Sequence, residues 1–407
     1  MSIITERTPA AVVPNVTKHE RFELNGAGSV TFEPAPYAPS RNISASYISN
    51  TTFPLSLTPS IPNQPVASLV AAIKKLSSDG TIRKLLTDHG AIYFQNLGLS
   101  GADEFSQFAS AFGWLPHEDI GNPVRRTVHA FNVATANEGP NTQPVYPHNE
   151  FGLSPHYPAY VLFYCAGEPE TGGETPINNS IVLYEELKAR HPEFIEKIEK
   201  KGVLYQLFYP NTPREDNTSP GTSVLQSYGK HVLDTDSVDE ARAKIEKEIR
   251  RLPTATWTWE NQSEANQLGD LRVWQRLPAT RLHEQTGKVA FFNNIISRYL
   301  NARAAGTLDP PHINQDGKYQ PPAFYGDKTL IPKEYMETAV EIVYKTRALV
   351  TWKEGDVLLI DNHAVQHARE PWTGPRKLLA SLWDDPVTSK PAQPANLGLG
   401  PFTQQAV

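Results

Sequence analysis

The pattern of apolar and polar residues changes near Pro65. Residues 1–62 are rich in Pro, Thr, Ser and Asn and show little helical periodicity, so we predict an extended N-terminal arm. Beyond Pro65, apolar residues recur at helical spacing and place Val66, Leu69 and Ile73 on one face of a helix. An arm of this kind can wrap the domain or contact another subunit of a homo-oligomer.

The rest of the pattern predicts a few helices among many short strands. The expected helices are residues 65–78, 81–89, 102–112, 179–201, 237–252 and 332–345. The expected strands are residues 29–32, 90–97, 203–208, 271–276, 289–293, 347–352, 356–360 and 378–383. This content predicts a mainly β barrel or sandwich with flanking helices, formed as one domain over residues 63–387. Residues 388–407 are expected to be a polar C-terminal tail.

Composition and charge exclude several classes of protein. The chain has 407 residues and a net charge of −6, and no basic stripe is present that could neutralise the phosphates of nucleic acid. Its single cysteine, Cys165, cannot form an intramolecular disulfide, which favours a reducing compartment. There is no membrane-spanning apolar stretch and no apolar core of a signal peptide, so we expect a cytoplasmic protein that does not bind membranes.

Two metal-binding residue types stand close together at His148 and Glu150. In an extended segment, residues i and i+2 face the same side, so this imidazole and this carboxylate can bind one ion. Two residues of one strand cannot complete a site, and a third ligand must come from elsewhere in the chain. By itself His-x-Glu is a weak pattern, and no His-Glu-x-x-His motif of zinc hydrolases is present.

The third ligand is expected after a second apolar strand, at residues 357–360. Asp361 and Asn362 turn the chain there, and the two histidines that follow are His363 and His367. Periodicity does not choose between them. Two histidines and one carboxylate bind one face of an octahedral ion and leave three positions open, which suits non-haem Fe(II).

Longer segments around these residues resemble the taurine dioxygenase (TauD/TfdA) superfamily. They are residues 148–158 (HNEFGLSPHYP), 162–166 (LFYCA), 172–177 (GGETPI), 355–369 (GDVLLIDNHAVQHAR) and 374–382 (GPRKLLASL). The resemblance covers residues 65 to 386 and leaves out the first 60 or so residues. It implies a double-stranded β-helix, a distorted jelly roll, which agrees with the predicted strands and helices.

The resemblance also implies roles for individual residues. Its spacing selects His367 over His363, so His148, Glu150 and His367 become the expected iron ligands. Thr175 matches a threonine that contacts 2-oxoglutarate, and Arg376 matches the arginine that holds the distal carboxylate of this cosubstrate. A guanidinium forms a two-pronged pair with a carboxylate, which suits such a role.

One departure from the common pattern narrows the resemblance. Many family members have His-x-Asp, whereas this chain has Glu150. The glutamate form resembles the clavaminate-synthase-like branch, whose members commonly act on amino acids or their derivatives. Related halogenases carry a small residue in place of the carboxylate, so Glu150 argues against halogenation.

The implied reaction is oxidation of an unactivated C–H bond of a small molecule, with Fe(II), 2-oxoglutarate and O₂. The outcome would be hydroxylation, or desaturation or cyclisation where hydroxyl transfer is slow, and specialised metabolism is the expected setting. Asn293, Arg126 and Tyr146 are the candidate substrate contacts, with Arg125 beside them in a segment that approaches the site in relatives.

Two other functional classes remain open at this point. One is a metal-dependent β-barrel enzyme that does not use 2-oxoglutarate, against which the pairing of Thr175 with Arg376 argues. The other is a non-catalytic relative that acts as a binding protein. A protein that no longer needs iron has no physical reason to keep all three ligands, which argues against this class.

Overall fold

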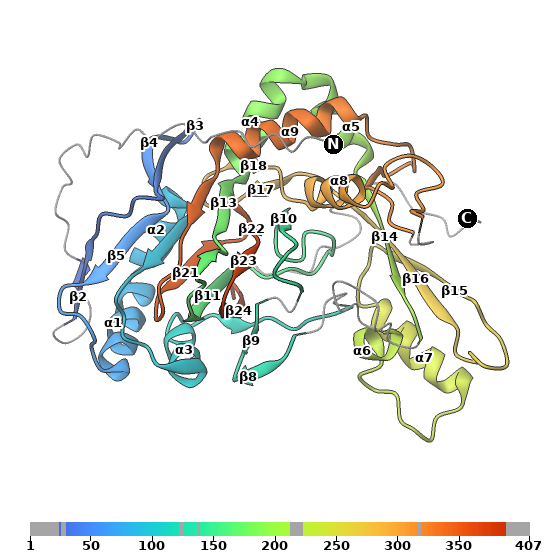
Figure 1. Ribbon diagram of the computed structural model, residues 1–407, viewed down its shortest axis with the longest axis horizontal. Helices are drawn as coiled ribbons and strands as arrows, with labels where there is room; N and C mark the ends of the chain where they lie inside the picture. The colour runs from blue at the N-terminus through green and yellow to red at the C-terminus, as the bar shows by residue number, and fades with distance from the viewer. Residues whose placement is uncertain are drawn as a thin grey trace.

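The computed structural model describes residues 24–25, 30–121, 126–136, 139–211, 223–315 and 319–387. The expected C-terminal tail, Arg125 and most of the first 29 residues lie outside these ranges. Within them the chain forms two sheets that face each other, with helices on the outer side of each (Figure 1). No helix of the described ranges is long and apolar enough to cross a membrane.

The larger sheet has ten strands in the order β1-β2-β5-β6-β21-β11-β24-β9-β8, with β7 paired to β24. Its strands are β1 (Leu24–Asn25), β2 (Thr31–Pro34), β5 (Leu55–Pro59), β6 (Ala91–Phe94), β7 (Leu115–Pro116), β8 (Val128–Ala130), β9 (Val133–Thr135), β11 (Tyr160–Gly167), β21 (Val357–Asp361) and β24 (Lys377–Asp384). All pairs in this sheet are antiparallel except β5 and β6, which are parallel.

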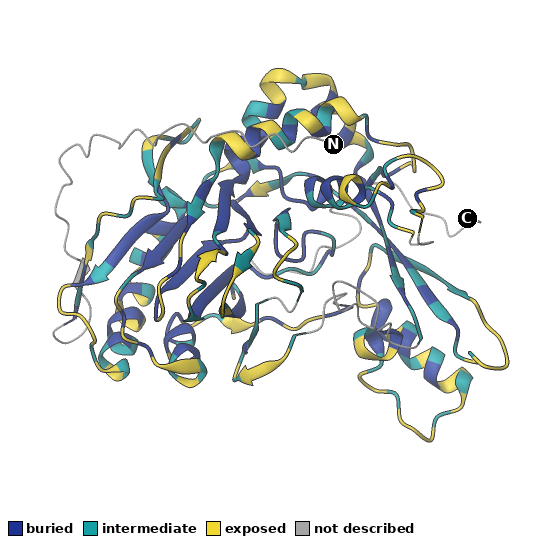
Figure 2. Ribbon diagram, viewed as in Figure 1, coloured by how far each residue is buried: buried dark blue, intermediate teal, exposed yellow. Residues whose placement is uncertain are grey.

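The smaller sheet faces the central strands of the larger one. It consists of β10 (Val145–His148), β22 (Val365–Arg369), β13 (Thr175–Asn179) and β20 (Ala348–Val350), in that order. The core between the sheets takes Tyr93 and Phe163 from the larger sheet and Ile177, Val350 and Val365 from the smaller one (Figure 2). Two sheets that share one core in this way form a jelly roll, so the predicted fold class is confirmed.

Alternation along the strands explains why the larger sheet is covered on both faces. In β6, Tyr93 points to the smaller sheet, while Ile92 and Phe94 point to the opposite face, where helices pack. These helices are α1 (Val66–Ser78), α2 (Thr81–His89) and α3 (Gly101–Ser110). All four residues of β6 are buried, as expected for a strand between two packed layers.

A second group of helices covers the smaller sheet, and a separate strand layer extends from it. The covering helices are α4 (Ser180–Arg190), α5 (Pro192–Lys201), α8 (Ile295–Ala304) and α9 (Lys333–Thr346). The extension has β14 (Val203–Tyr209), β15 (Ala255–Glu260), β16 (Asp270–Leu277) and β19 (Phe324–Tyr325), with α6 (Val224–Tyr228) and α7 (Val238–Ile249) packed on it. The remaining strands form three two-stranded sheets: β3 (Arg41–Ala45) with β4 (Ile48–Phe53), β12 (Thr171–Gly172) with β23 (Trp372–Thr373), and β17 (Arg281–His283) with β18 (Lys288–Ala290).

The structure differs from the predicted elements in a few places. The helix expected at residues 179–201 is divided, because Pro192 disfavours a helical conformation at His191 and instead begins α5. Within the segment expected to be an extended arm, β2 and β5 are strands of the larger sheet. The helix α8 and the strand β15 were not predicted. The helix expected at residues 237–252 is confirmed as α7, which begins with a capping box in which Ser237 and Glu240 bond each other's backbone.

Candidate metal centre and active-site cavity

Two adjacent strands of the smaller sheet bring the histidines of the predicted metal site together. β10 and β22 are antiparallel, and His148 lies directly opposite His367 in their register. The centroids of the two imidazole rings are 4.3 Å apart. Directly opposed residues of paired strands are close enough for their side chains to share a ligand.

Glu150 completes the group from a turn rather than from the same strand. β10 ends at His148, and Gly152 N–H then donates to the Asn149 carbonyl at 2.9 Å. The turn holds Phe151 at φ +55°, a left-handed conformation that bulky residues rarely adopt. Glu150 Oε2 consequently lies 3.2 Å from His367 Nε2 and 3.8 Å from His148 Nε2. The expectation that Glu150 shares a strand face with His148 is wrong, but the two side chains still converge.

Two buried asparagines hold this turn in place. The Asn362 side chain accepts from the Glu150 N–H at 2.8 Å and donates to the Glu150 carbonyl at 2.9 Å. The Asn149 side chain donates to the Val365 carbonyl at 3.2 Å and accepts from the Asn293 N–H at 3.1 Å. Because buried amides with satisfied partners are rigid, they fix the backbone that carries Glu150 relative to β22.

The donor set fits a divalent metal ion in its chemistry and its protonation. His148 Nδ1 lies 2.8 Å from the Tyr146 carbonyl, which makes Nδ1 the donor and leaves the lone pair of Nε2 for a metal. Burial, and then the neighbouring His367, lower the pKa of His148 to about 4. The ligand atoms of His148, Glu150 and His367 lie within 4.8 Å of one another. Neutral imidazoles and one carboxylate are the ligands of a facial-triad iron site.

Arg126 determines the charge state of the carboxylate. Its Nη2 donates to Glu150 Oε1 in a close ion pair. Burial alone would raise the pKa of Glu150, but Arg126 and the histidines outweigh burial and hold this pKa well below its usual range. The carboxylate is therefore ionised, as a metal ligand must be.

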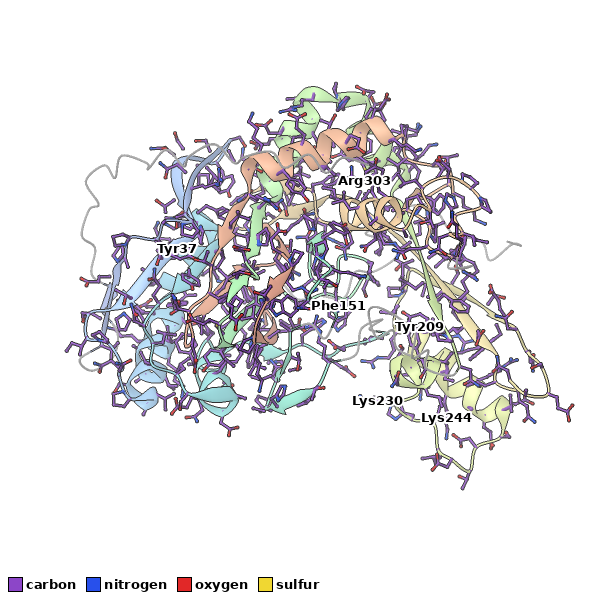
Figure 3. All side chains as sticks on the ribbon, in the orientation of Figure 1. Tyr37, Phe151, Tyr209, Lys230, Lys244 and Arg303 are labelled. Carbon is purple, nitrogen blue, oxygen red and sulfur yellow. The ribbon has the colours of Figure 1, made fainter. Side chains whose placement is uncertain are left out.

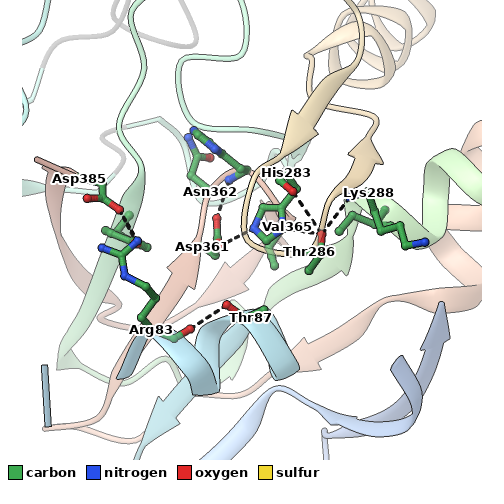
Figure 4. Close-up of polar contacts among 12 residues, drawn as sticks. Arg83, Thr87, His283, Thr286, Lys288, Asp361, Asn362, Val365 and Asp385 are labelled. Atoms are coloured by element: carbon green, nitrogen blue, oxygen red, sulfur yellow. Dashed lines mark hydrogen bonds and ion pairs between the residues drawn. The ribbon is translucent and has the colours of Figure 1, made fainter. Parts of the chain in front are cut away.

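The alternative ligand, His363, points away from this group. Its ring contacts Tyr157 and Phe292, with centroids 5.2 and 5.6 Å away. The turn that separates it from β21 is held by Asp361, whose Oδ2 lies 2.9 Å from His283 Nε2 (Figure 4). This geometry agrees with the choice of His367 that the family resemblance implied.

The three candidate ligands line a cavity of about 170 Å³. Its walls also include the apolar side chains of Phe151, Phe163 and Leu378, and Figure 3 shows Phe151 beside the strands of the two sheets. The full lining is Arg126, Ala136, Val145, His148, Glu150, Phe151, Leu153, Phe163, Thr175, Asn294, His367, Ala368, Arg369, Arg376 and Leu378. A concave, mostly apolar site with a few directed polar groups is typical of a small-molecule pocket.

The two residues predicted to contact 2-oxoglutarate both line this cavity. Thr175 is the first residue of β13, and its Oγ1 accepts from the Trp352 indole at 3.0 Å, which leaves the hydroxyl proton for another acceptor. Arg376 Nε donates to the Gly173 carbonyl at 2.9 Å. A Cβ at position 173 would lie 2.8 Å from Arg376 Cδ, so glycine is needed there for the arginine to take this position.

A second arginine raises the positive charge beside Arg376. Arg369 Nη2 donates to the carbonyls of Pro140 and Gln143 at 2.9 and 2.6 Å. Burial, and then the charge of Arg369, lower the pKa of Arg376 to about 10. Burial also lowers the pKa of Arg369 to about 10. Both groups remain cationic at neutral pH, and a bound anion would relieve their mutual repulsion.

The three residues predicted to contact substrate have different positions. Arg126 lines the cavity. The Asn293 side chain donates to the Ala279 carbonyl and accepts from the Ile295 N–H, so its polar atoms are occupied inside the protein. Tyr146 packs against the helix cluster behind the smaller sheet. Their neighbours Asn294 and Val145 line the cavity instead, a one-residue difference that periodicity does not resolve.

Comparison with known proteins identifies the family of this chain. Residues 57–383 match the taurine catabolism dioxygenase TauD, TfdA family. The chain is 31% identical over 304 residues to a clavaminate synthase-like protein of Arabidopsis thaliana, an alignment that covers 73% of this chain and 82% of the relative. It is 26% identical over 360 residues to the dapdiamide synthesis protein DdaC of Enterobacter agglomerans, covering 83% and 96% of the two chains. The predicted likeness to clavaminate-synthase-like proteins is confirmed.

The chain also has distant neighbours among solved structures. A taurine dioxygenase from Burkholderia xenovorans is 15% identical, with a TM-score of 0.43, and the match covers 88% of this chain and 93% of the other. AAD-2 in complex with Mn(II) and N-oxalylglycine is 12% identical, also with a TM-score of 0.43, over 87% and 99%. Enzymes of this family use Fe(II), 2-oxoglutarate and O₂. The chain belongs to the TauD, TfdA family and is an Fe(II)- and 2-oxoglutarate-dependent dioxygenase.

Proposed function

We propose that His148, Glu150 and His367 bind Fe(II), and that Thr175 and Arg376 bind the distal carboxylate of 2-oxoglutarate. The observation that carries this proposal is the convergence of three ligand atoms in the cavity that Thr175 and Arg376 also line. When bound, Fe(II) supplies the activation of O₂ with 2-oxoglutarate as the reductant. The protein binds and orients the reactants and excludes water.

The roles of the cosubstrate residues follow from their free hydrogen-bonding atoms. The contacts of Arg376 with the described residues use Nε and the face of the guanidinium, which lies over Trp372. Its two terminal amino groups can therefore grip a carboxylate, and the Thr175 hydroxyl can donate a further bond. A carboxylate buried without such partners would be strongly destabilised.

We further propose that the substrate is a small molecule with an acidic group, such as an amino acid or a derivative, oxidised at an unactivated C–H bond. The cavity walls carry three arginines, Arg126, Arg369 and Arg376, against the single carboxylate of Glu150. The side chains that line the cavity are therefore more cationic than anionic. A substrate anion would balance this charge.

The names of the relatives support a role in specialised metabolism. One is described as clavaminate synthase-like and the other as a dapdiamide synthesis protein. The product could be a hydroxylated, desaturated or cyclised molecule, because all three outcomes follow the same hydrogen abstraction. Glu150 occupies the position that halogenases leave to chloride, so the proposal does not include halogenation.

The test is an anaerobic titration of the Fe(II)-loaded protein with 2-oxoglutarate, followed through the visible charge-transfer band of the chelated complex. The proposal predicts a band in the wild type that weakens strongly in Arg376→Met and is lost in His367→Ala. Substrate-dependent formation of succinate, measured over amino acids and their derivatives, then identifies the substrate class. A wild type that binds metal without developing the band would contradict the assignment of the cosubstrate site.

A further inference from the structure

We infer that Arg126 is a positioning residue that keeps Glu150 bound to the metal through one oxygen only. The inference rests on the proposed metal site and goes beyond it. In this role Arg126 sets how Glu150 binds the metal, in addition to lining the cavity. The supporting observations are the separate partners of the two carboxylate oxygens, the burial of the pair and the elements that hold each partner.

The two oxygens of Glu150 have different neighbours. Oε2 faces the histidines and lies 3.2 Å from His367 Nε2. Oε1 accepts a hydrogen bond from Arg126 Nη2 in a close ion pair. One oxygen is thus directed to the metal position, and the other is occupied by a cation. A guanidinium is suited to this task because it stays charged and its donors are held in a rigid plane.

Burial makes this division of the carboxylate stable. The side chains of Arg126 and Glu150 are 15% and 7% exposed, so water competes weakly for either group. A buried ion pair resists separation because each charge would be left without a partner in a medium of low polarity. Rotation of the carboxylate to present both oxygens to a metal would break this pair.

The two partners are also fixed by separate parts of the fold. Arg126 precedes β8, and the carbonyl of the next residue, Thr127, accepts from the Thr135 N–H at 2.8 Å, which ties the backbone to β9. Glu150 is held at its backbone by the side chain of Asn362. The ion pair therefore joins the edge of the larger sheet to the turn after β10. Because each partner is held by its own part of the fold, rotation of the carboxylate would separate the pair.

The chemical consequence concerns the number of open metal positions. Three protein ligands on an octahedral ion leave three positions, which is the number that a bidentate cosubstrate and O₂ require. A glutamate bound through both oxygens would take one of them. Holding Oε1 on Arg126 preserves the third position before any substrate arrives.

The test uses Arg126→Met in the complete protein without substrate, so that a substrate contact alone cannot produce the effect. Water-proton relaxation of the Mn(II)-loaded protein counts metal-bound waters, and we expect the relaxivity to fall by about one third as three waters become two. In the anaerobic protein without cosubstrate we expect the Fe(II) affinity to fall about 10- to 100-fold, the usual effect of losing a partner of a metal ligand.

Controls separate this inference from the proposed function. Arg303→Met removes a surface arginine on α8 that pairs with Glu337, and it should leave both readouts unchanged (Figure 3). Arg126→Ala provides a second variant if methionine does not give folded protein. Wild-type relaxivity and wild-type Fe(II) affinity in either folded variant would overturn the inference. A wild type that binds no metal at the triad would overturn the proposed function itself.

Discussion

The two ends of the active-site cavity differ in how their charges are balanced. At the candidate metal end, the negative charge of Glu150 is paired with Arg126. At the opposite end, Arg369 and Arg376 repel each other, and their hydrogen-bond acceptors include backbone carbonyls, which carry no net charge. The carboxylate at the metal end is therefore paired within the protein, whereas Arg376 is the residue that we propose to pair with an anion of the cosubstrate. A ligand with a carboxylate at one end and metal-binding oxygens at the other would satisfy both.

Removing a metal ligand should have the largest effect, because it acts directly on Fe(II) binding at the metal end. We expect His367→Ala to lower Fe(II) affinity and turnover by more than about 100-fold, because loss of a direct ligand exceeds the usual effect of losing an outer partner. His363→Ala is the matched control, since this ring contacts Tyr157 and Phe292 rather than the triad. Metal binding is measured by equilibrium dialysis. Equal losses in the two variants would contradict the assignment of His367.

Removing the cation at the other end should affect the cosubstrate alone. Truncating one partner of a buried charge pair costs about 2–5 kcal/mol, so Arg376→Met should weaken 2-oxoglutarate binding by about 30-fold or more. The Fe(II) affinity should stay near that of the wild type, because Arg376 does not contact the triad. Arg376→Lys keeps the charge without the two-pronged geometry, so its affinity for 2-oxoglutarate should lie between those of the wild type and Arg376→Met. An unchanged KM for 2-oxoglutarate in Arg376→Met would refute this role.

The asparagines behind the metal end should matter for stability as well as for catalysis. Asn362→Ala leaves the Glu150 N–H and the carbonyls of Glu150 and Pro158 without their side-chain partner. Each buried group left unsatisfied costs about 1–3 kcal/mol, so we expect the free energy of unfolding to fall by about 3 kcal/mol. Urea denaturation measures this loss. Asn42→Ala, at an exposed position of β3, is the comparison variant, and an equal effect there would show that the turn is not specifically stabilised.

A smaller, pH-dependent effect should come from the pair beneath this turn. Burial alone would lower the pKa of His283 and raise the pKa of Asp361. The attraction between the two side chains outweighs burial, so the pKa of His283 is raised and the pKa of Asp361 is lowered. The histidine contribution is complete below its unfolded pKa of about 6.5 and is lost as pH rises through the raised value. The aspartate contribution is complete above about 3.9 and is lost as pH falls through the lowered value.

His283→Gln should therefore reduce stability most between about pH 4 and 6.5, by about 1.5 kcal/mol, and less at pH 9. Urea denaturation at several pH values gives the difference between variant and wild type. His129→Gln serves as the control, because this histidine is exposed and bonds the Thr135 hydroxyl. A loss of stability for His283→Gln that does not change with pH would mean that the pair is not ionised in the folded protein.

Local patterns along the chain were sufficient for strands and helices with a strong apolar signal. The apolar run at residues 357–360 and the helical spacing at residues 332–345 predicted β21 and α9 closely. The division between α4 and α5 was visible at Pro192, but the apolar periodicity on both sides concealed it. The strand β15 was missed because all six of its residues are only partly buried, so its apolar pattern is weak.

The sequence by itself determined which chemical groups are present and, through the family resemblance, which of them belong to one site. Only the tertiary structure decided their geometry. His148 and His367 meet because of strand register, and Glu150 joins them through a turn at Phe151 that strand periodicity did not predict. The ion pair of Arg126 with Glu150 joins two segments of the chain, and no helix or strand periodicity predicts that they meet. The physical reason is that periodicity reports which face of an element is buried, whereas the partner across a buried contact depends on long-range packing.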